Sequence, residues 1–398
     1  MSAREVFLSL AGRYRLRPEE AERLVLASRE ASRADWKAVV EETLYRETGG
    51  LLCHHLREAG VDPPKALRKE YRWIALSNTM IEAELRRIAP RLEEAGLRVL
   101  LIKGTALHQT VYKNPGVRNF EDSDWVLAEQ ADTERAGRVL GVLGYEPDSQ
   151  EVDAHWTLGP FIIEFHRNTL GDERVASRVS GLEADSGEVN AEIWARARPS
   201  ALGEPYLMPA PEDHLLILCA HLMKHNFEPG IWFVDLEALL KETEHFDWEA
   251  ALERANRWGL LRPLAFAFRN LGALNSDEKA GGRETLLPPE VRGELAAVRP
   301  TLLEGFLLAL AARGERLYGE KEEWERPPLA NLLWLSSHRG LGGKIRLLWE
   351  AAFPSGEVMS VIYPAYRPGL RWWFMARRAA DLIRLCVRVM ALSQAGSR

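Results

Sequence analysis

The sequence predicts an α+β fold, in which a small mixed β-sheet is flanked by helices, with an N-terminal helical region and a larger C-terminal one. Apolar residues recur three, four or seven positions apart through residues 67–88, the spacing of one helix face. A continuously apolar run at 97–102 is typical of a buried strand. Two apolar segments, 155–159 and 160–168, meet at a Gly-Pro pair and are typical of hairpin strands.

Residues 1–95 are predicted to be helical. The stretch at 17–31 begins with a proline and glutamates, which suit a helix N-terminus. The stretch at 34–50 ends in a glycine pair, a plausible helix C-cap. The longest periodic stretch, 63–96, contains Pro90, and we expect this proline to end or kink the helix.

Residues 96–200 are predicted to form the central, sheet-containing domain. After the first strand, the segment at 105–113 has helical spacing, and the segment at 123–130 leads from a strand into a helix at 131–144. Residues 169–205 are polar and irregular, and we interpret them as an insertion or linker.

Residues 201–398 are predicted to form a C-terminal helical domain. Helical periodicity returns at residue 209 and continues, with breaks, to the C-terminus. A polar stretch at 275–289 is interpreted as a flexible connection. A chain of 398 residues exceeds one ordinary core and suggests two or three packed units, here 1–95, 96–200 and 201–398.

The composition is that of a soluble globular protein, with 46% hydrophobic and 28% charged residues. The net charge of −6 provides no general basic field, which disfavours long nucleic acid as a partner. The sequence does not specify an oligomeric state.

The cysteines and the apolar runs both favour a cytoplasmic protein. Cys53, Cys219 and Cys386 are far apart and form no CxxC pair, as expected for buried, reduced thiols. The longest uninterrupted apolar run, 306–312, is far shorter than the roughly 20 residues that span a bilayer. The apolar segment near the N-terminus is also too short for a signal peptide, so we expect neither a leader nor a transmembrane segment.

Lys103, Gly104 and Thr105 follow the strand at 97–102 and precede a helix. A glycine lets the backbone approach a ligand closely, and a helix N-terminus offers free N–H groups to a phosphate. Thr105 would add a hydroxyl donor. The alternative is an ordinary tight turn without a ligand.

Asp122 and Asp124 bracket Ser123 at the start of an apolar run. Residues i and i+2 of a strand point to the same face, so these two carboxylates can share a divalent metal. Ser123 should then face away from the metal. The alternative is a solvated acidic turn.

Glu164 lies within an otherwise apolar strand, between Ile163 and Phe165. A carboxylate there must be paired, bound to a metal, or placed on the wet face of an edge strand. His166, two residues on, shares that face.

Taken together, these motifs resemble the polymerase-beta-type nucleotidyltransferase superfamily, and most closely its uncharacterised bacterial branch of stand-alone nucleotidyltransferases. The resemblance spans about residues 70 to 390 and includes a C-terminal stretch with "LWEAAFPSGEVM" and "YPAY". The segments that carry the resemblance are "LLIKGTAL", "VYKNPGVRNFEDSDWVL", "IIEFHRN", "PEDHLLILCAHLMKHNF" and "IWFVDLEALL".

The resemblance implies Mg²⁺-dependent transfer of a nucleotide from an NTP to an acceptor, with release of pyrophosphate and with two metal ions expected. The acceptor would be a hydroxyl or phosphate of a small molecule, peptide or protein. By position, the carboxylates would ligate the metals, with Glu164 as third ligand or general base, and the strand-to-helix turn would hold the triphosphate. The implied metal ligands are Asp122, Asp124 and Glu164, and the implied nucleotide-binding residues are Lys103, Gly104, Thr105 and Arg118.

The sequence departs from the superfamily in small ways and leaves two other functions open. Thr105 stands where serine is frequent, Ser123 occupies a usually apolar position, and the third carboxylate is a glutamate. The same metal site could instead support kinase-like transfer of the γ-phosphate. A non-catalytic nucleotide-binding or interaction protein is the third possibility.

His221, Lys224 and His225 lie on one face of a predicted helix. The segment lacks the glutamate of a zinc-protease motif, which disfavours that chemistry. A metal site shared with Asp213, His214 and Asp235 and a purely structural role are both open. We expect these three residues, together with His166, to line an acceptor pocket.

The C-terminal stretch 367–390 has six arginines against one aspartate, with interleaved aromatic residues. It could bind a polyanion or lie at a membrane surface. The alternative is a helix that packs its apolar face and exposes its arginines to water.

Overall fold

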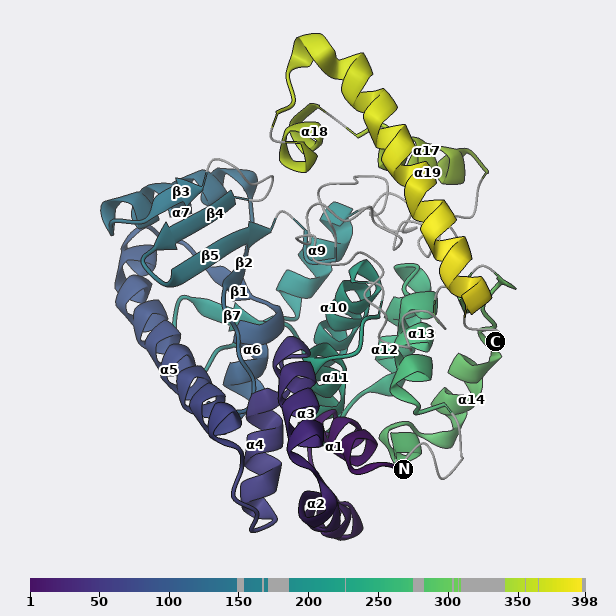
Figure 1. Ribbon diagram of the computed structural model, residues 1–398. Coiled ribbons are helices and arrows are strands. Elements are labelled where there is room, and N and C mark those ends of the chain that lie inside the picture. The colour runs from purple at the N-terminus through teal and green to yellow at the C-terminus, as the bar shows by residue number, and fades with distance from the viewer. Residues whose placement is uncertain are drawn as a thin grey trace.

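The computed structural model places a seven-stranded sheet between two groups of helices (Figure 1). The sequence prediction of an α+β fold is therefore confirmed. The structure describes residues 1–148, 154–166, 168–170, 186–225, 227–274, 283–302, 304–306, 308, 341–354, 356–363 and 365–395. Most of the predicted connection at 275–289, much of the predicted insertion at 169–205, and the side chain of Cys386 lie outside the described part of the chain.

The N-terminal region is helical, as predicted. Capping boxes at Ser2 and Ser32 begin the first and third helices. Phe7, Leu24 and Leu52 belong to one small apolar core that these helices share. The helices are α1 (Ala3–Ala11), α2 (Pro18–Glu30), α3 (Arg33–Tyr45), α4 (Gly49–Glu58) and α5 (Lys65–Glu94).

Pro90 is predicted to end or kink helix α5, but α5 continues through Pro90 to Glu94, so the predicted end is wrong and the kink stays a prediction. A proline removes one backbone hydrogen bond from a helix. The buried Ile88 and Leu92, on either side of Pro90, anchor this last part of α5 in the core against the sheet. Tertiary packing thus outweighs the local preference.

The sheet is mixed, with strand order β3-β4-β5-β2-β1-β7-β6. Strand β2 is parallel to β5, and β1 is parallel to β7, whereas the other neighbours are antiparallel. The predicted hairpin is present as β4 and β5. The strands are β1 (Val99–Leu101), β2 (Ser123–Leu127), β3 (Glu146–Asp148), β4 (Ala154–Leu158), β5 (Phe161–His166), β6 (Arg198–Pro199) and β7 (Tyr206–Met208).

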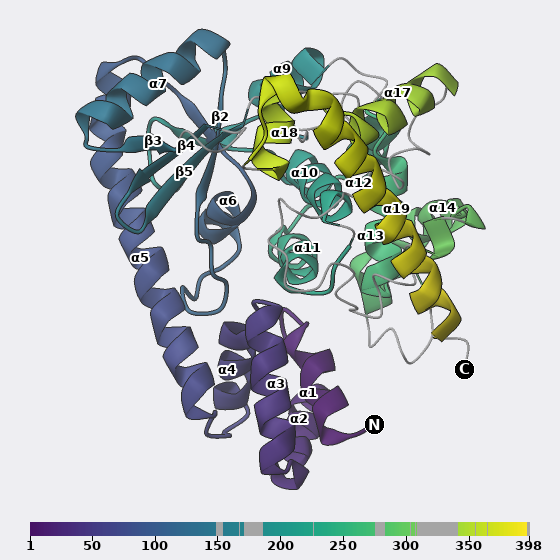
Figure 2. The ribbon, with the colours of Figure 1, turned by 45° about the horizontal axis from the view of Figure 1, so that its top comes forward.

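Helices cover both faces of the sheet (Figure 2). Helices α5 and α7 (Gln130–Val142) lie on one face, where Trp125 is fully buried. Helix α6 (Lys103–Thr110) lies on the other face and contacts the C-terminal helices α10 (Pro211–Lys224) and α11 (Ile231–Glu242).

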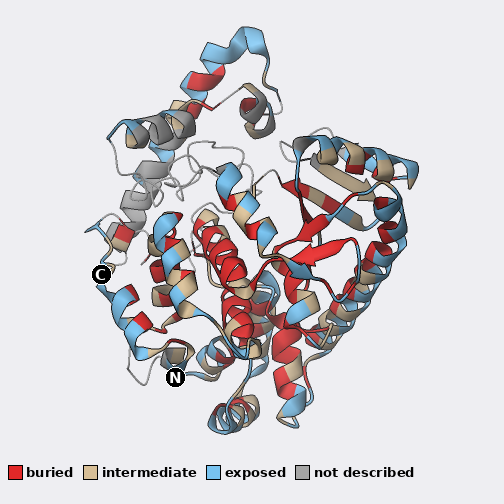
Figure 3. Ribbon diagram, turned by 180° about the vertical axis from the view of Figure 1, so that it is seen from behind, coloured by how far each residue is buried: buried red, intermediate tan, exposed pale blue. Residues whose placement is uncertain are grey.

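Helix α10 is buried along almost its whole length and forms the centre of the C-terminal region (Figure 3). Its core cluster also includes Leu51 and Leu100, and so joins residues from all three predicted domains. The boundaries at 95 and 200 stay predictions. The other helices of the described residues are α9 (Ser186–Ala195), α12 (Trp248–Arg257), α13 (Leu261–Leu271), α14 (Pro289–Ala297), α17 (Leu341–Ala352), α18 (Gly356–Ile362) and α19 (Arg371–Ala395), with 3-10 turns at Arg283–Leu286 and Pro368–Leu370.

No helix among the described residues combines the length and apolarity needed to cross a membrane.

Candidate active site

The turn from β1 into α6 has an unusual backbone. Lys103 has φ of +52°, a left-handed conformation that is costly for a residue with a side chain. Gly104 follows, and a Cβ there would lie 3.0 Å from the Cβ of Phe120, so a larger residue would be tightly packed unless Phe120 shifted. Ile102, at the N-cap of α6, makes no side-chain cap hydrogen bond, and within the described part of the chain no side chain bonds the first N–H groups of the helix, which suits a ligand.

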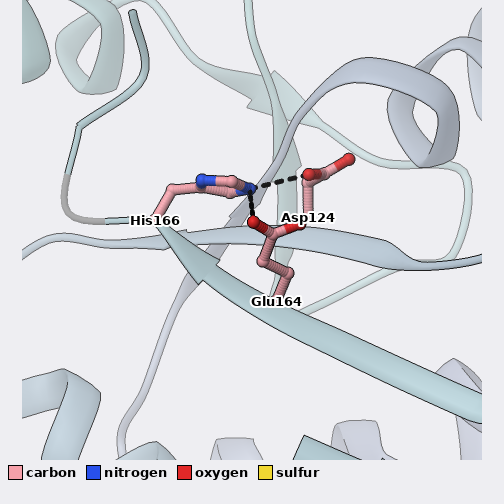
Figure 4. A group of neighbouring side chains, drawn as sticks. All are labelled: Asp124, Glu164 and His166. Atoms are coloured by element: carbon pink, nitrogen blue, oxygen red, sulfur yellow. Dashed lines mark hydrogen bonds and ion pairs between the residues drawn. The ribbon is translucent and has the colours of Figure 1, made fainter. Parts of the chain in front are cut away.

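The pairing of β2 with β5 brings two of the predicted carboxylates together. Asp124 lies opposite Glu164 in the parallel register, and Val126 lies opposite His166. Side chains of Asp124, Glu164 and His166 therefore converge on one face of the sheet (Figure 4). The Nε2 atom of His166 is 2.7 Å from Oδ1 of Asp124 and 3.6 Å from Oε1 of Glu164.

Asp122 immediately precedes β2 and lines the same pocket as Asp124 and Glu164. Burial, and then the charges of Asp124 and Glu164, raise the pKa of Asp122 to about 7. Burial alone would raise the pKa of Asp124 as well, but Lys103 and His166 hold it below its usual value. The site therefore concentrates more negative charge than its neighbours neutralise.

Lys103 is the cation closest to these carboxylates. Its Nζ lies 2.6 Å from Oδ1 of Asp124 and 3.3 Å from Nε2 of His166. Although burial acts to lower the pKa of Lys103, the surrounding carboxylates, Asp124 first, raise it above its usual value. Lys103 is therefore a fixed positive charge.

This donor set suits a divalent metal. Asp124, Glu164 and His166 each offer a ligand atom, and these atoms lie within 4.8 Å of one another. Asp122 adds a further carboxylate from the same pocket wall. Mg²⁺ prefers hard oxygen ligands, which the three carboxylates supply, whereas the imidazole nitrogen of His166 is a softer donor. The excess negative charge also favours cation binding. The residues fit the Mg²⁺ that the sequence motifs imply.

Thr105 and Ser123 lie behind the carboxylates. The Thr105 hydroxyl is buried and donates to the backbone carbonyl of Asp122, at 3.3 Å. It therefore does not face the pocket as expected, because the first turn of α6 directs it toward β2. Ser123 faces away from the site, as predicted, and accepts a 2.8 Å hydrogen bond from the indole of Trp125.

Arg118 lines the pocket and is held there by Asp235, a residue that the sequence analysis considered for an alternative metal site. Its Nε and Nη2 atoms lie 3.1 and 3.0 Å from the two carboxylate oxygens of Asp235 on α11. The hydroxyl of Tyr112 donates to the same carboxylate at 2.6 Å. Asp235 thus fixes the Arg118 fork, and the two charges largely offset each other.

The pocket has a volume of about 360 Å³ and lies between the sheet and the C-terminal helices. His221 and Lys224 of α10, with its C-cap residue His225, line the wall contributed by those helices, together with Trp232 of α11. The rings of His221 and His225 lie 4.4 Å apart, and Trp232 is 5.0 and 4.5 Å from them. Burial, with the charges of His225 and Lys103, lowers the pKa of His221 well below its usual value, so this ring is neutral.

The predicted site residues are thus mostly brought together. The carboxylates, Lys103, Gly104, Arg118 and the α10 residues line one pocket, and His166 joins it through Asp124. Two pocket residues that the sequence analysis did not identify are Trp232 and Glu47. Glu47 lies in a turn of the N-terminal region and has φ of +58°. Trp232 lies in the segment "IWFVDLEALL" that carries the family resemblance, whereas no local motif distinguishes Glu47.

The alternative His/Asp metal site is not present among the described residues, where the single group with metal-ligand spacing is Asp124, Glu164 and His166. Asp213 instead lies in the first turn of α10 and pairs with Arg196 and Arg254, at 2.9 Å from each.

Comparison with known proteins gives one match. The model of a family described as "uncharacterised nucleotidyltransferase" matches residues 32–274, more than half of the chain. No curated protein and no solved structure matches. The match ends before residue 348, so the resemblance of the C-terminal stretch stays a prediction. The matched range contains the carboxylates, the β1–α6 turn and the histidines of α10, and the chain therefore belongs to this nucleotidyltransferase family.

Proposed function

We propose that the protein transfers a nucleoside monophosphate from an NTP to a hydroxyl or phosphate group of an acceptor, in a Mg²⁺-dependent reaction. The observation that carries the proposal is the convergence of Asp122, Asp124 and Glu164 beside the free N-terminus of α6. Membership of a nucleotidyltransferase family supports the reaction class.

In the proposed reaction, the acceptor oxygen forms a bond to the α-phosphorus as the bond to the β-phosphate oxygen breaks. Pyrophosphate leaves, and the acceptor proton passes to a carboxylate of the pocket, the role that the family resemblance gives to Glu164. The residues that would hold Mg²⁺, with two ions expected, are Asp122, Asp124 and Glu164. Bound Mg²⁺ supplies neutralisation of the phosphate charge and activation of the attacking oxygen.

The chain's own residues orient the NTP. The free N–H groups at the start of α6 suit the triphosphate, and Gly104 keeps the backbone open to it. Lys103 contributes positive charge, and Lys103 and Arg118 both line the pocket and offer N–H donors. Thr105 contributes through its backbone N–H, since its hydroxyl is bonded to Asp122.

The opposite wall is the proposed acceptor side. His221, Lys224 and His225 face the carboxylates across the pocket and offer hydrogen-bonding groups. His166 lies against Asp124, so we now place it with the metal-binding residues rather than with the acceptor. The acceptor is proposed to be a small molecule or a peptide or protein side chain. A cytoplasmic setting is supported by the buried free thiols of Cys53 and Cys219.

The decisive experiment uses ATP labelled at either the α- or the γ-phosphate, incubated with the protein, Mg²⁺ and a host extract. We expect the α-label to appear in an acceptor. Transfer of the γ-label instead would identify a kinase, and tight NTP binding without transfer of either label would identify a nucleotide-binding protein. Intact-mass analysis of the products with each NTP would identify the acceptor and the preferred base.

A further inference from the structure

The last long helix, α19, has one face packed on its own small core. Phe374 is buried against Met359, which is on α18, and against Tyr363, which immediately follows α18. The hydroxyl of Tyr363 donates to Asp381 at 2.7 Å. These contacts fix which face of α19 points inward.

The opposite face of α19 is apolar and exposed. On a helix with 3.6 residues per turn, its large apolar side chains fall within an arc of roughly 100°, which is the width of a buried stripe in an ordinary surface helix. Ala376 and Ala380 lie in the same arc. The large exposed side chains are Trp372 (83%), Trp373 (56%), Ile383 (64%) and Val387 (55%).

The neighbouring helix shows the same feature. Helix α17 packs against α19 and exposes an apolar residue at every fourth position. A stripe at this spacing is normally buried. These residues are Leu341 (75%), Ile345 (57%) and Trp349 (61%). Figure 1 shows α17 and α19 at the edge of the molecule, away from the N-terminal helices.

Arginines surround the exposed face of α19. Arg367, Arg371, Arg377 and Arg384 are all exposed, whereas Asp381 is half-buried and bonded to Tyr363 and Arg384. The chain as a whole carries a net charge of −6, so this local positive charge is opposite in sign to the rest of the molecule. An apolar stripe edged by arginines complements a surface that is apolar within and anionic outside.

We propose that this surface, formed by the exposed side chains of α19 and α17 and named here the arginine–tryptophan surface, docks on a bilayer leaflet that contains anionic phospholipids. Indole rings favour the depth of the headgroups, aliphatic side chains favour the acyl boundary, and arginines bind lipid phosphates. Ile383, Val387 and Leu341 favour lipid over RNA, since aliphatic side chains offer bases no stacking partner. The inference does not depend on the proposed nucleotidyl transfer.

The test is co-sedimentation of the full chain with vesicles at an ionic strength of about 0.15 M. One set contains phosphatidylglycerol and phosphatidylcholine in equal parts, and the other contains phosphatidylcholine alone. We expect binding to the anionic vesicles with a blue shift of tryptophan emission, and much weaker binding to the neutral ones.

Variants locate the binding surface. The double variant Trp372→Ala/Trp373→Ala should lose vesicle binding, and Arg371→Gln should weaken it by roughly fivefold, as expected for one arginine near an anionic membrane. Trp73→Ala removes a tryptophan of comparable exposure on α5 and should bind like the unchanged protein. Circular dichroism checks that each variant is folded.

Three results would overturn the proposal. The first is no preference for anionic vesicles by the unchanged protein. The second is equal binding by folded Trp372→Ala/Trp373→Ala. The third is a dimer or an RNA complex that depends on these tryptophans when vesicles are not bound, which would assign the surface to another copy of the chain or to RNA.

Discussion

The Nζ atom of Lys103 lies 2.6 Å from Oδ1 of Asp124, and both residues line the pocket that holds Asp122 and Glu164. The lysine ammonium therefore contacts a carboxylate that we propose as a metal ligand. Lysine and metal would share or compete for the same oxygen atoms, and this relationship can be tested directly.

Replacement of Lys103 by methionine should increase the response to Mg²⁺. Without the ammonium, Asp122, Asp124 and Glu164 repel one another, and a divalent cation then relieves more repulsion than it does in the unchanged protein. The rise in thermal midpoint on adding Mg²⁺ to EDTA-treated protein should be larger in Lys103→Met. Lys224→Met, on the opposite pocket wall, is the control and should respond like the unchanged protein. An equal rise in both variants would contradict the competition.

The double variant Asp122→Asn/Asp124→Asn should lose nucleotidyl transfer by at least about a hundredfold, since even residues that only support metal ligands are worth 10- to 100-fold. Transfer of the α-label measures this loss. Glu134→Gln, which changes an exposed carboxylate on α7, should keep full activity. Retained activity in the double variant would remove these aspartates from the metal site.

Gly104→Ala should destabilise the protein by about 1–3 kcal/mol, the usual cost of an overpacked site. The added Cβ would lie 3.0 Å from the Cβ of Phe120 and 3.5 Å from Nη2 of Arg118. Gly141→Ala is the matched control, because its Cβ would meet nothing closer than 3.9 Å, from Trp156. Urea denaturation should show the first variant weakened and the second unchanged or slightly stabilised by higher helix propensity.

Asp235→Asn should cost about 3–5 kcal/mol, because it leaves the buried Arg118 guanidinium without its charged partner. A paired change, Arg118→Met/Asp235→Leu, removes both charges and should cost less than the sum of the single changes Arg118→Met and Asp235→Leu. A double-mutant cycle from urea denaturation measures this coupling. Strict additivity would show that the two side chains do not stabilise each other.

Stability should fall as the pH drops below about 6.5, the ordinary pKa of histidine. Burial lowers the pKa of folded His55 to about 4, although its Nε2 lies 2.8 Å from the backbone carbonyl of Arg13. Between these two values the unfolded chain binds a proton that the folded chain excludes, so acid favours unfolding by up to about 3 kcal/mol.

The measurement is the free energy of unfolding from pH 7 to pH 4 for the unchanged protein and for His55→Gln. The slope should be shallower in His55→Gln, which cannot titrate, and unchanged in His245→Gln, where the side chain is exposed. Identical slopes for all three proteins would show that His55 does not contribute.

Local sequence was enough to find the centre of the site. Asp122 and Asp124 stand two residues apart before an apolar strand, and Lys103-Gly104 stands between a strand and a helix, so short-range geometry already fixes where these groups point. The strand that carries Glu164 could also be predicted locally, because an apolar segment follows a Gly-Pro pair there. Alternation along a strand also placed Ser123 on the opposite face.

Tertiary packing decided the rest. The hydroxyl of Thr105 bonds to Asp122 instead of facing a phosphate, and helix α5 passes through Pro90, because neighbouring elements offset the local preference. Asp235 meets Arg118 across 117 residues of sequence. Contacts of that range depend on how helices pack on a sheet, and no spacing rule in the chain encodes them. The sequence by itself therefore predicted which carboxylates and which lysine meet in the pocket. Only the tertiary structure decided which distant side chains, such as Asp235, position them, because those contacts depend on how the helices pack on the sheet.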